Sequence, residues 1–176
     1  MRSVWSTAAA ALVVAATLAA CGSDQPGQAG PTPAPTPASA PKLAVEVTWA
    51  TPPFGRTAIT STLTGAGLGA HAARFFEIDE TPNDLVITVR IVDGQWTAYR
   101  AAGSPVQKVN DRGTYAADGT TLLYRPDTGG SNTYRWSVTG NELTLTFVST
   151  TEPDFEGVPN DVFQRAFYTT VAFHRV

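Results

Sequence analysis

The stretch DLVITVRIVDGQWTAYRA, residues 84–101, decides the fold class. Its first half alternates apolar and polar side chains, which is the pattern of a strand buried on one face. The side chains expected on the buried face are Leu85, Ile87, Val89 and Ile91. Asp93-Gly94 then supplies a strong signal for a two-residue turn, and residues 95–101 run on as a second strand. The stretch therefore predicts an antiparallel β-hairpin.

Short predicted strands separated by turn signals continue along the chain. Turn signals occur at Asp118-Gly119, at 126–132 and at 139–141. We expect strands at 44–50, 84–92, 95–101, 113–117, 120–125, 133–138, 142–149 and 167–175. Eight sequential antiparallel strands close most simply into an up-and-down barrel, which leaves no exposed edge. The predicted fold is therefore mainly β, an eight-stranded up-and-down antiparallel barrel with one or two short helices.

The helices are expected in two places. Near 67–76, Leu68, Ala72 and Phe75 have the spacing of one apolar helix face. A second short helix is expected near 160–166, with Asn160 or Asp161 as its cap. The path of 51–66 stays open, because 56–64 can either extend the first strand or run as a loop.

The start of the chain has the features of an export signal. A short basic start is followed by an apolar run of about 17 residues, at the lower end of what spans a bilayer. The run ends in Leu18-Ala19-Ala20-Cys21, and Cys21 is the only cysteine of the chain. This motif resembles the lipobox of bacterial lipoproteins. The resemblance implies that residues 1–20 are a signal peptide and that Cys21 is lipidated, holding the protein to the extracytoplasmic face of the cell membrane.

The remainder divides into a tether and one domain. Residues 22–42 are rich in Pro, Thr and Ala, a composition that cannot bury enough apolar surface to fold, so 21–42 is expected to be a disordered stalk behind the lipidated cysteine. Residues 43–176 are long enough for a single domain with its own core. Lipidation of Cys21 would leave no thiol for a disulfide, so this exported domain must depend on its packing.

The charge pattern excludes one class of partner. The chain has 12 Lys and Arg against 15 Asp and Glu, a net charge of −3, and no basic cluster. Nucleic-acid binding is therefore not expected.

The blocks GTYAADGTTL and YRWSVTGNELTLTF, with Trp49 on the first strand and an Arg-Val end, carry a family likeness. They resemble lipocalin-like (calycin-type) barrels of bacterial lipoproteins, and are similar to barrels at the end of actinobacterial solute-binding lipoproteins. The resemblance implies a structural role for Trp49 and Arg175, in which the guanidinium stacks on the indole and closes the barrel floor.

No residue pattern indicates catalysis, a metal or a cofactor. The two histidines, His71 and His174, give too few ligands for a metal site, and no nucleophile motif is present. The acidic loop from Glu152 to Gly157 does not match a calcium-binding loop, and a solvated loop is the simpler interpretation. We therefore expect a protein that is not an enzyme and has no cofactor.

Function is expected to lie in the barrel interior and mouth. An eight-stranded barrel is wide enough to hold one small ligand or to be filled by side chains. The hypothetical contacts for a small apolar ligand are Trp96, Tyr134, Trp136, Phe147 and Phe173, with loops 102–112 and 150–161 as gates. The alternative is a solid-cored module that docks an envelope protein, for which the expected sign is an outer aromatic patch of Tyr99, Tyr124 and Tyr168.

Overall fold

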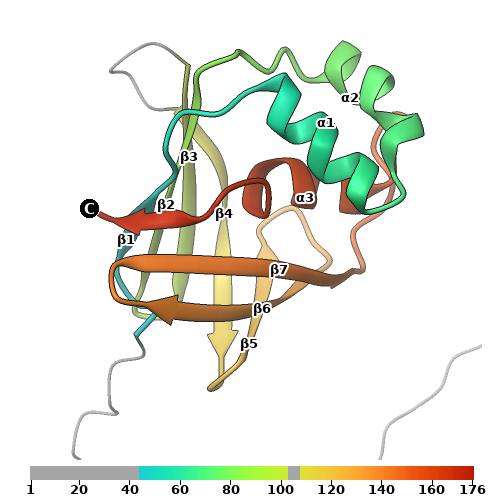
Figure 1. Cartoon of the computed structure of the whole chain (residues 1–176). Helices are drawn as coiled ribbons and strands as arrows, with labels where there is room; N and C mark the ends of the chain where they lie inside the picture. Colours follow the sequence, from blue (N-terminus) through green and yellow to red (C-terminus); the bar gives the residue numbers. More distant parts are fainter. Residues whose placement is uncertain (1–43, 103–107) are drawn as a thin grey trace, which may run out of the picture. The chain divides into compact units, whose positions relative to one another are not determined.

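A computed structural model describes residues 44–102 and 108–176, and these form a closed antiparallel barrel of eight strands in sequence order (Figure 1). The expected fold is confirmed. The strands are β1 (Thr48–Ala50), β2 (Leu85–Val92), β3 (Gln95–Ala102), β4 (Lys108–Ala117), β5 (Thr121–Pro126), β6 (Asn132–Thr139), β7 (Glu142–Thr150) and β8 (Phe173–Arg175). The predicted signal peptide, Cys21, the predicted tether and residues 103–107 lie outside the described residues.

The β2–β3 hairpin has the predicted geometry. Val92 pairs with Gln95 across the turn, and Asp93 and Gly94 have φ values of 50° and 76°, as a tight two-residue hairpin requires. Leu85, Ile87, Val89 and Ile91 are all buried, so the alternation in the sequence did identify the core face.

The barrel closes between two three-residue strands. β1 pairs with both β2 and β8, and Trp49 lies opposite Arg175. The Arg175 Cζ atom lies 5.5 Å from the centroid of the Trp49 ring, and Trp49 Nε1 donates a hydrogen bond to the carbonyl oxygen of Val45 at 2.9 Å. Trp49 is fully buried at this end of the barrel, which we call the floor. The opposite end, where β3, β5 and β7 finish, is the mouth.

The mouth is covered by helices, and here the sequence prediction was incomplete. The described residues contain three α-helices and one 3-10 turn: α1 (Arg56–Gly65), η1 (Gly69–His71), α2 (Ala72–Ile78) and α3 (Asn160–Tyr168). α1 covers the segment for which the sequence allows either an extension of the first strand or a loop, so that segment is neither. Its Thr and Ile residues favour strands, but burial of Ile59 and Leu63, four residues apart, outweighs that preference.

α3 packs between the barrel and the other helices. Phe75 of α2 contacts Phe163 and Phe167 of α3, with ring centroids 5.2 and 5.7 Å apart. Figure 1 shows α1 and α2 beyond α3, on the side away from β6. The expected helix near 160–166 is confirmed, and the expected helix near 67–76 begins later, after the 3-10 turn.

The predicted last strand, 167–175, was wrong in its first half. Phe167 and Tyr168 belong to α3, and only 173–175 form β8. The helix continues because Val162, Ala166 and Phe167 are buried on one face, and it ends where Thr170 Oγ1 donates to the carbonyl oxygens of Arg165 and Ala166. Similarly, β1 is shorter than the predicted strand 44–50.

Two β-bulges lie near the mouth. Between Ala98 and Tyr99 of β3 the partner strand β4 carries one extra residue, Asn110, and β7 carries Val148 as an extra residue opposite β6. Bulges bend a strand and redirect its side chains. The first of them shapes the site described below.

The close approach of β4 and β5 at Gly113 gives a test of the barrel packing. A Cβ atom at Gly113 would lie 2.0 Å from the carbonyl oxygen of Arg125, whereas one at Gly119 would meet nothing within 4 Å. We expect Gly113→Ala to lower the free energy of unfolding by about 1–3 kcal/mol, measured by urea denaturation. Gly119→Ala should stay within about 0.5 kcal/mol of the parent. Equal effects of the two variants would contradict this packing.

Candidate functional site

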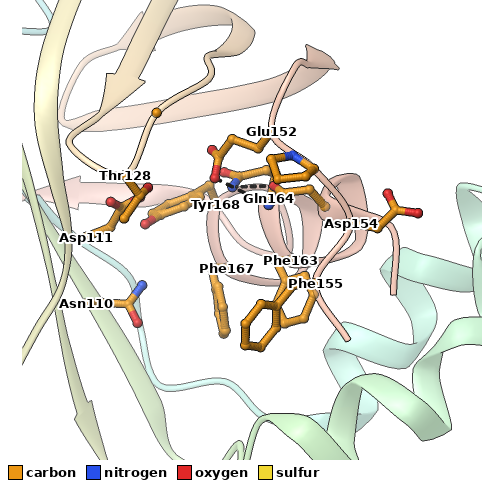
Figure 2. Close-up of a pocket in the computed structure, with 13 residues that line it drawn as sticks. Asn110, Asp111, Thr128, Glu152, Asp154, Phe155, Phe163, Gln164, Phe167 and Tyr168 are labelled. Carbon is orange, nitrogen blue, oxygen red and sulfur yellow. Dashed lines mark hydrogen bonds between the residues drawn. The ribbon is translucent and has the colours of Figure 1, made fainter. Parts of the chain in front are cut away.

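A cavity of about 380 Å³ lies at the barrel mouth, against α3 (Figure 2). Its walls come from the start of β4, the β5–β6 turn, the β7–α3 loop and α3 itself. The lining residues are Asn110, Asp111, Thr128, Gly129, Glu152, Pro153, Asp154, Phe155, Asn160, Phe163, Gln164, Phe167 and Tyr168. The cavity is therefore built from segments distant in sequence, which the barrel brings together.

The β4 bulge places Asn110 and Asp111 at the rim. Asp111 pairs with Ala98 and shares the inward parity of Gly113 and Tyr115, which are buried farther along the same strand. Asn110, the extra residue, also lines the cavity. Without the bulge a strand would point these neighbours to opposite faces, so the irregularity allows both to reach one site.

Glu152 faces the cavity from the segment just after β7. Its carboxylate accepts hydrogen bonds from Asn132 Nδ2 and, at 3.3 Å, from Asn160 Nδ2. Its own backbone N–H donates to Thr150 Oγ1 at 3.0 Å. The start of β6 and the start of α3 thus hold the Glu152 carboxylate, and the end of β7 holds its backbone.

Hydrogen bonds continue from Glu152 into the barrel. Gln164 Nε2 donates to Asn160 Oδ1 at 2.9 Å, and the Tyr134 hydroxyl donates to Gln164 Oε1 at 2.5 Å. Gln164 and Tyr134 are both buried. This chain of polar groups is not predictable from the sequence, because a lone glutamine on an amphipathic helix has no distinguishing pattern.

Both interior carboxylates are electrostatically perturbed. Burial raises the pKa of Asp111, against a smaller lowering effect of the Tyr124 hydroxyl. Burial also raises the pKa of Glu152, and the nearby negative charge of Asp111 raises it further. The hydrogen bonds from Asn132 and Asn160 act in the opposite direction but do not offset these effects.

Two tyrosine hydroxyls are directed toward this acidic region without a regular hydrogen bond. Tyr124 and Tyr168 are 0% and 2% exposed, and neither hydroxyl has a partner with hydrogen-bond geometry. Burial raises the pKa of both tyrosines above the ordinary value. Asp111 lies close enough to Tyr124 to raise its pKa further, and Asn110 lies close enough to Tyr168 to lower its pKa slightly.

The remaining wall is aromatic. Phe163 and Phe167 project from α3, and Phe155 from the β7–α3 loop packs edge-on against Phe163 with ring centroids 5.9 Å apart. Phe155 is 52% exposed, so one aromatic face at the lip is open to solvent. Figure 2 shows the three rings grouped on one side of the cavity and the Glu152 and Asp111 side chains on another.

The five hypothetical ligand contacts do not line this cavity. Trp96, Tyr134 and Phe173 are fully buried and Phe147 is 9% exposed, whereas Trp136 is half-buried with Nε1 donating to the Asp118 carbonyl at 3.0 Å. Trp96 lies 5.0 Å from Tyr124 and 5.6 Å from Tyr168, centroid to centroid. These rings fill the barrel interior beneath the mouth.

The expected outer aromatic patch is wrong for two of its three members. Tyr124 and Tyr168 are buried, and only Tyr99 is partly exposed. In β5 the adjacent Leu122 and Leu123 made the inward parity ambiguous, and Leu122 and Tyr124 share the inner face. Tyr168 is inward because it belongs to α3 rather than to a strand.

The described residues contain no cluster of three or more metal-ligating side chains and no helix long and apolar enough to cross a membrane. Comparison of the chain with protein-family models, with curated proteins and with solved structures gave no match. The geometry of the cavity is therefore the basis for a functional proposal.

The raised pKa of Glu152 gives a stability test. Because the native state favours the protonated carboxyl, this group contributes stability at low pH that is lost as pH rises through its native pKa. Glu152→Gln removes the charge and keeps an oxygen acceptor for Asn132, and it gives up only the longer bond accepted from Asn160 at 3.3 Å. We expect the variant to be more stable than the parent at about pH 7, and this gain to shrink toward about pH 4.

Urea denaturation at the two pH values measures this difference. Glu142→Gln, at an exposed position at the start of β7, is the matched control and should show no such trend. A Glu152→Gln variant that is less stable than the parent at neutral pH would contradict the assigned environment.

Proposed function

We propose that the protein is an extracytoplasmic lipoprotein, anchored in the cell membrane through Cys21, whose lipocalin-like barrel binds a small ligand with an apolar body. The ligand site we propose is the mouth cavity rather than the barrel interior. The observation that carries the proposal is the cavity itself, with an aromatic wall and buried polar groups converging on one space. Ligand pockets typically combine a mostly apolar lining with a few fixed polar groups.

The polar groups support binding more than stability. Burying carboxylates and hydroxyls costs free energy unless each is fully paired, and apolar side chains would fill the mouth at lower cost. Here Asp111 and Glu152 keep raised pKa values and Tyr168 keeps an unpaired hydroxyl. Polar groups that are buried at a cost in folding free energy are typical of functional sites.

A second candidate is the solid-cored module that docks another envelope protein. The observation in its favour is the filled interior, where Trp96, Tyr124, Tyr134 and Tyr168 pack against one another. Against it, two of the tyrosines expected on the outer surface are buried. Ligand binding at the mouth is the better supported of the two.

The anchor is tested on the full chain in a bacterial host supplied with labelled palmitate. Cys21→Ala should remove the label from the protein, because the thiol sulfur is the atom that would carry the lipid. Gly22→Ala, one residue later, should leave the labelling intact. Label retained in Cys21→Ala would contradict the lipoprotein assignment.

The binding site is tested with N-phenyl-naphthylamine, a neutral apolar dye whose fluorescence rises in apolar surroundings. The part Ala40–Val176 is a compact unit that contains every described strand and helix, so it can be produced alone. Thr128→Trp should fill the cavity and reduce dye affinity about tenfold or more, whereas Thr146→Trp, exposed on β7, should not. Equal binding by both variants, or none by the parent, would contradict a mouth site.

A further inference from the structure

All charged side chains that line the mouth cavity are acidic. Asp111, Glu152 and Asp154 contribute to its lining, and no Lys, Arg or His does so among the described residues. Three arginines on the surrounding elements have partners of their own, and Arg112, the residue after Asp111, pairs with Asp127 at 3.1 Å. Arg100 makes a two-point contact with Asp79 at 2.6 and 2.8 Å, and Arg165 lies over the Phe147 ring at 4.8 Å.

A separate observation points to a missing partner in the same place. Tyr168 lines the cavity and is 2% exposed, and its hydroxyl has no partner in hydrogen-bond geometry, although Asn110 lies close enough to lower its pKa slightly against the raising effect of burial. Buried polar atoms of native proteins are almost always paired, so an orphan in a cavity wall marks a position where a ligand atom fits. The hydroxyl can both accept and donate a hydrogen bond.

The aromatic wall of the cavity, like its carboxylates, favours a positively charged ligand. The faces of aromatic rings carry partial negative charge and attract cations. This protein already uses such contacts, because Arg100 lies over Phe167 at 4.7 Å and Arg56 over Phe76 at 5.0 Å. Phe155, half exposed at the lip, adds an open ring to the cavity wall across from the carboxylates.

We propose that the mouth cavity recognises its ligand as an organic cation, namely a protonated amine on a flat apolar body. The inference rests on the proposed function and adds the ligand's chemical class. An ammonium group carries three N–H donors, for which Asp111, Glu152 and the Tyr168 hydroxyl oxygen are three acceptors from three different segments. The apolar body lies against Phe155 and Phe163. An anionic ligand would face uncompensated carboxylates there, and a neutral one would gain no ion pair.

The test is isothermal titration calorimetry of Ala40–Val176 with three probes of similar shape. Phenethylamine is cationic, phenethyl alcohol is neutral and hydrocinnamate is anionic near neutral pH. We expect phenethylamine to bind about tenfold more tightly than phenethyl alcohol, and hydrocinnamate to bind most weakly. Asp111→Asn and Glu152→Gln should each weaken phenethylamine binding about tenfold.

Both variants retain an oxygen acceptor, so Asp111→Asn still accepts from the backbone N–H of Arg112, and circular dichroism verifies that each is folded. Glu142→Gln removes one negative charge at the floor end and should leave the affinity unchanged. Phenethylamine affinity that is unaffected by both site variants would overturn the proposal.

The remaining outcomes separate the two claims. If phenethyl alcohol or hydrocinnamate binds as tightly as phenethylamine, and Thr128→Trp blocks it, the cation preference is wrong while the ligand site stands. If none of the three probes binds but the naphthylamine dye does, the cation preference is likewise wrong. If neither the probes nor the dye bind, the proposed function fails together with this inference.

Discussion

The position of α3 in the barrel mouth determines how the barrel interior is filled and where the cavity lies. The hydrogen bond from the Tyr134 hydroxyl to Gln164 joins the helix to the barrel wall in a fully buried position. The same helix supplies Tyr168 to the interior and Phe163 and Phe167 to the outer helices. Because α3 packs against the barrel on one side and against the outer helices on the other, its side chains fill the barrel interior. The cavity that we assign to a ligand therefore lies at the rim.

This arrangement separates stability from function along the barrel axis. At the floor, Trp49 is buried under the short strands that close the barrel, with Arg175 across its ring. At the mouth, a bulge in β4 and the segment after β7 bring Asp111 and Glu152 to one cavity at an electrostatic cost. The apolar packing below gives the rigid support that a costly polar site needs.

The sequence predicted the barrel well because its signals are local. Alternation in 84–92 and the Asp93-Gly94 turn each need only neighbouring residues. It did not predict α1, whose β-branched residues adopt a helix only because Ile59 and Leu63 have a buried face to cover. The site depends still more on tertiary structure, since Asp111, Glu152 and Gln164 reach one cavity from a bulge, a loop and a helix that have no common sequence pattern.

A crystal structure with a bound amine would show whether a cation site lies between the carboxylates and the aromatic wall at the mouth. Crystals of Ala40–Val176 grown with phenethylamine should show its nitrogen about 2.7–2.9 Å from a carboxylate oxygen of Asp111 or Glu152. Its ring should lie against Phe163, with the Trp96 cluster in the interior undisturbed. A probe found inside the barrel, or with its nitrogen away from both carboxylates, would contradict the claim.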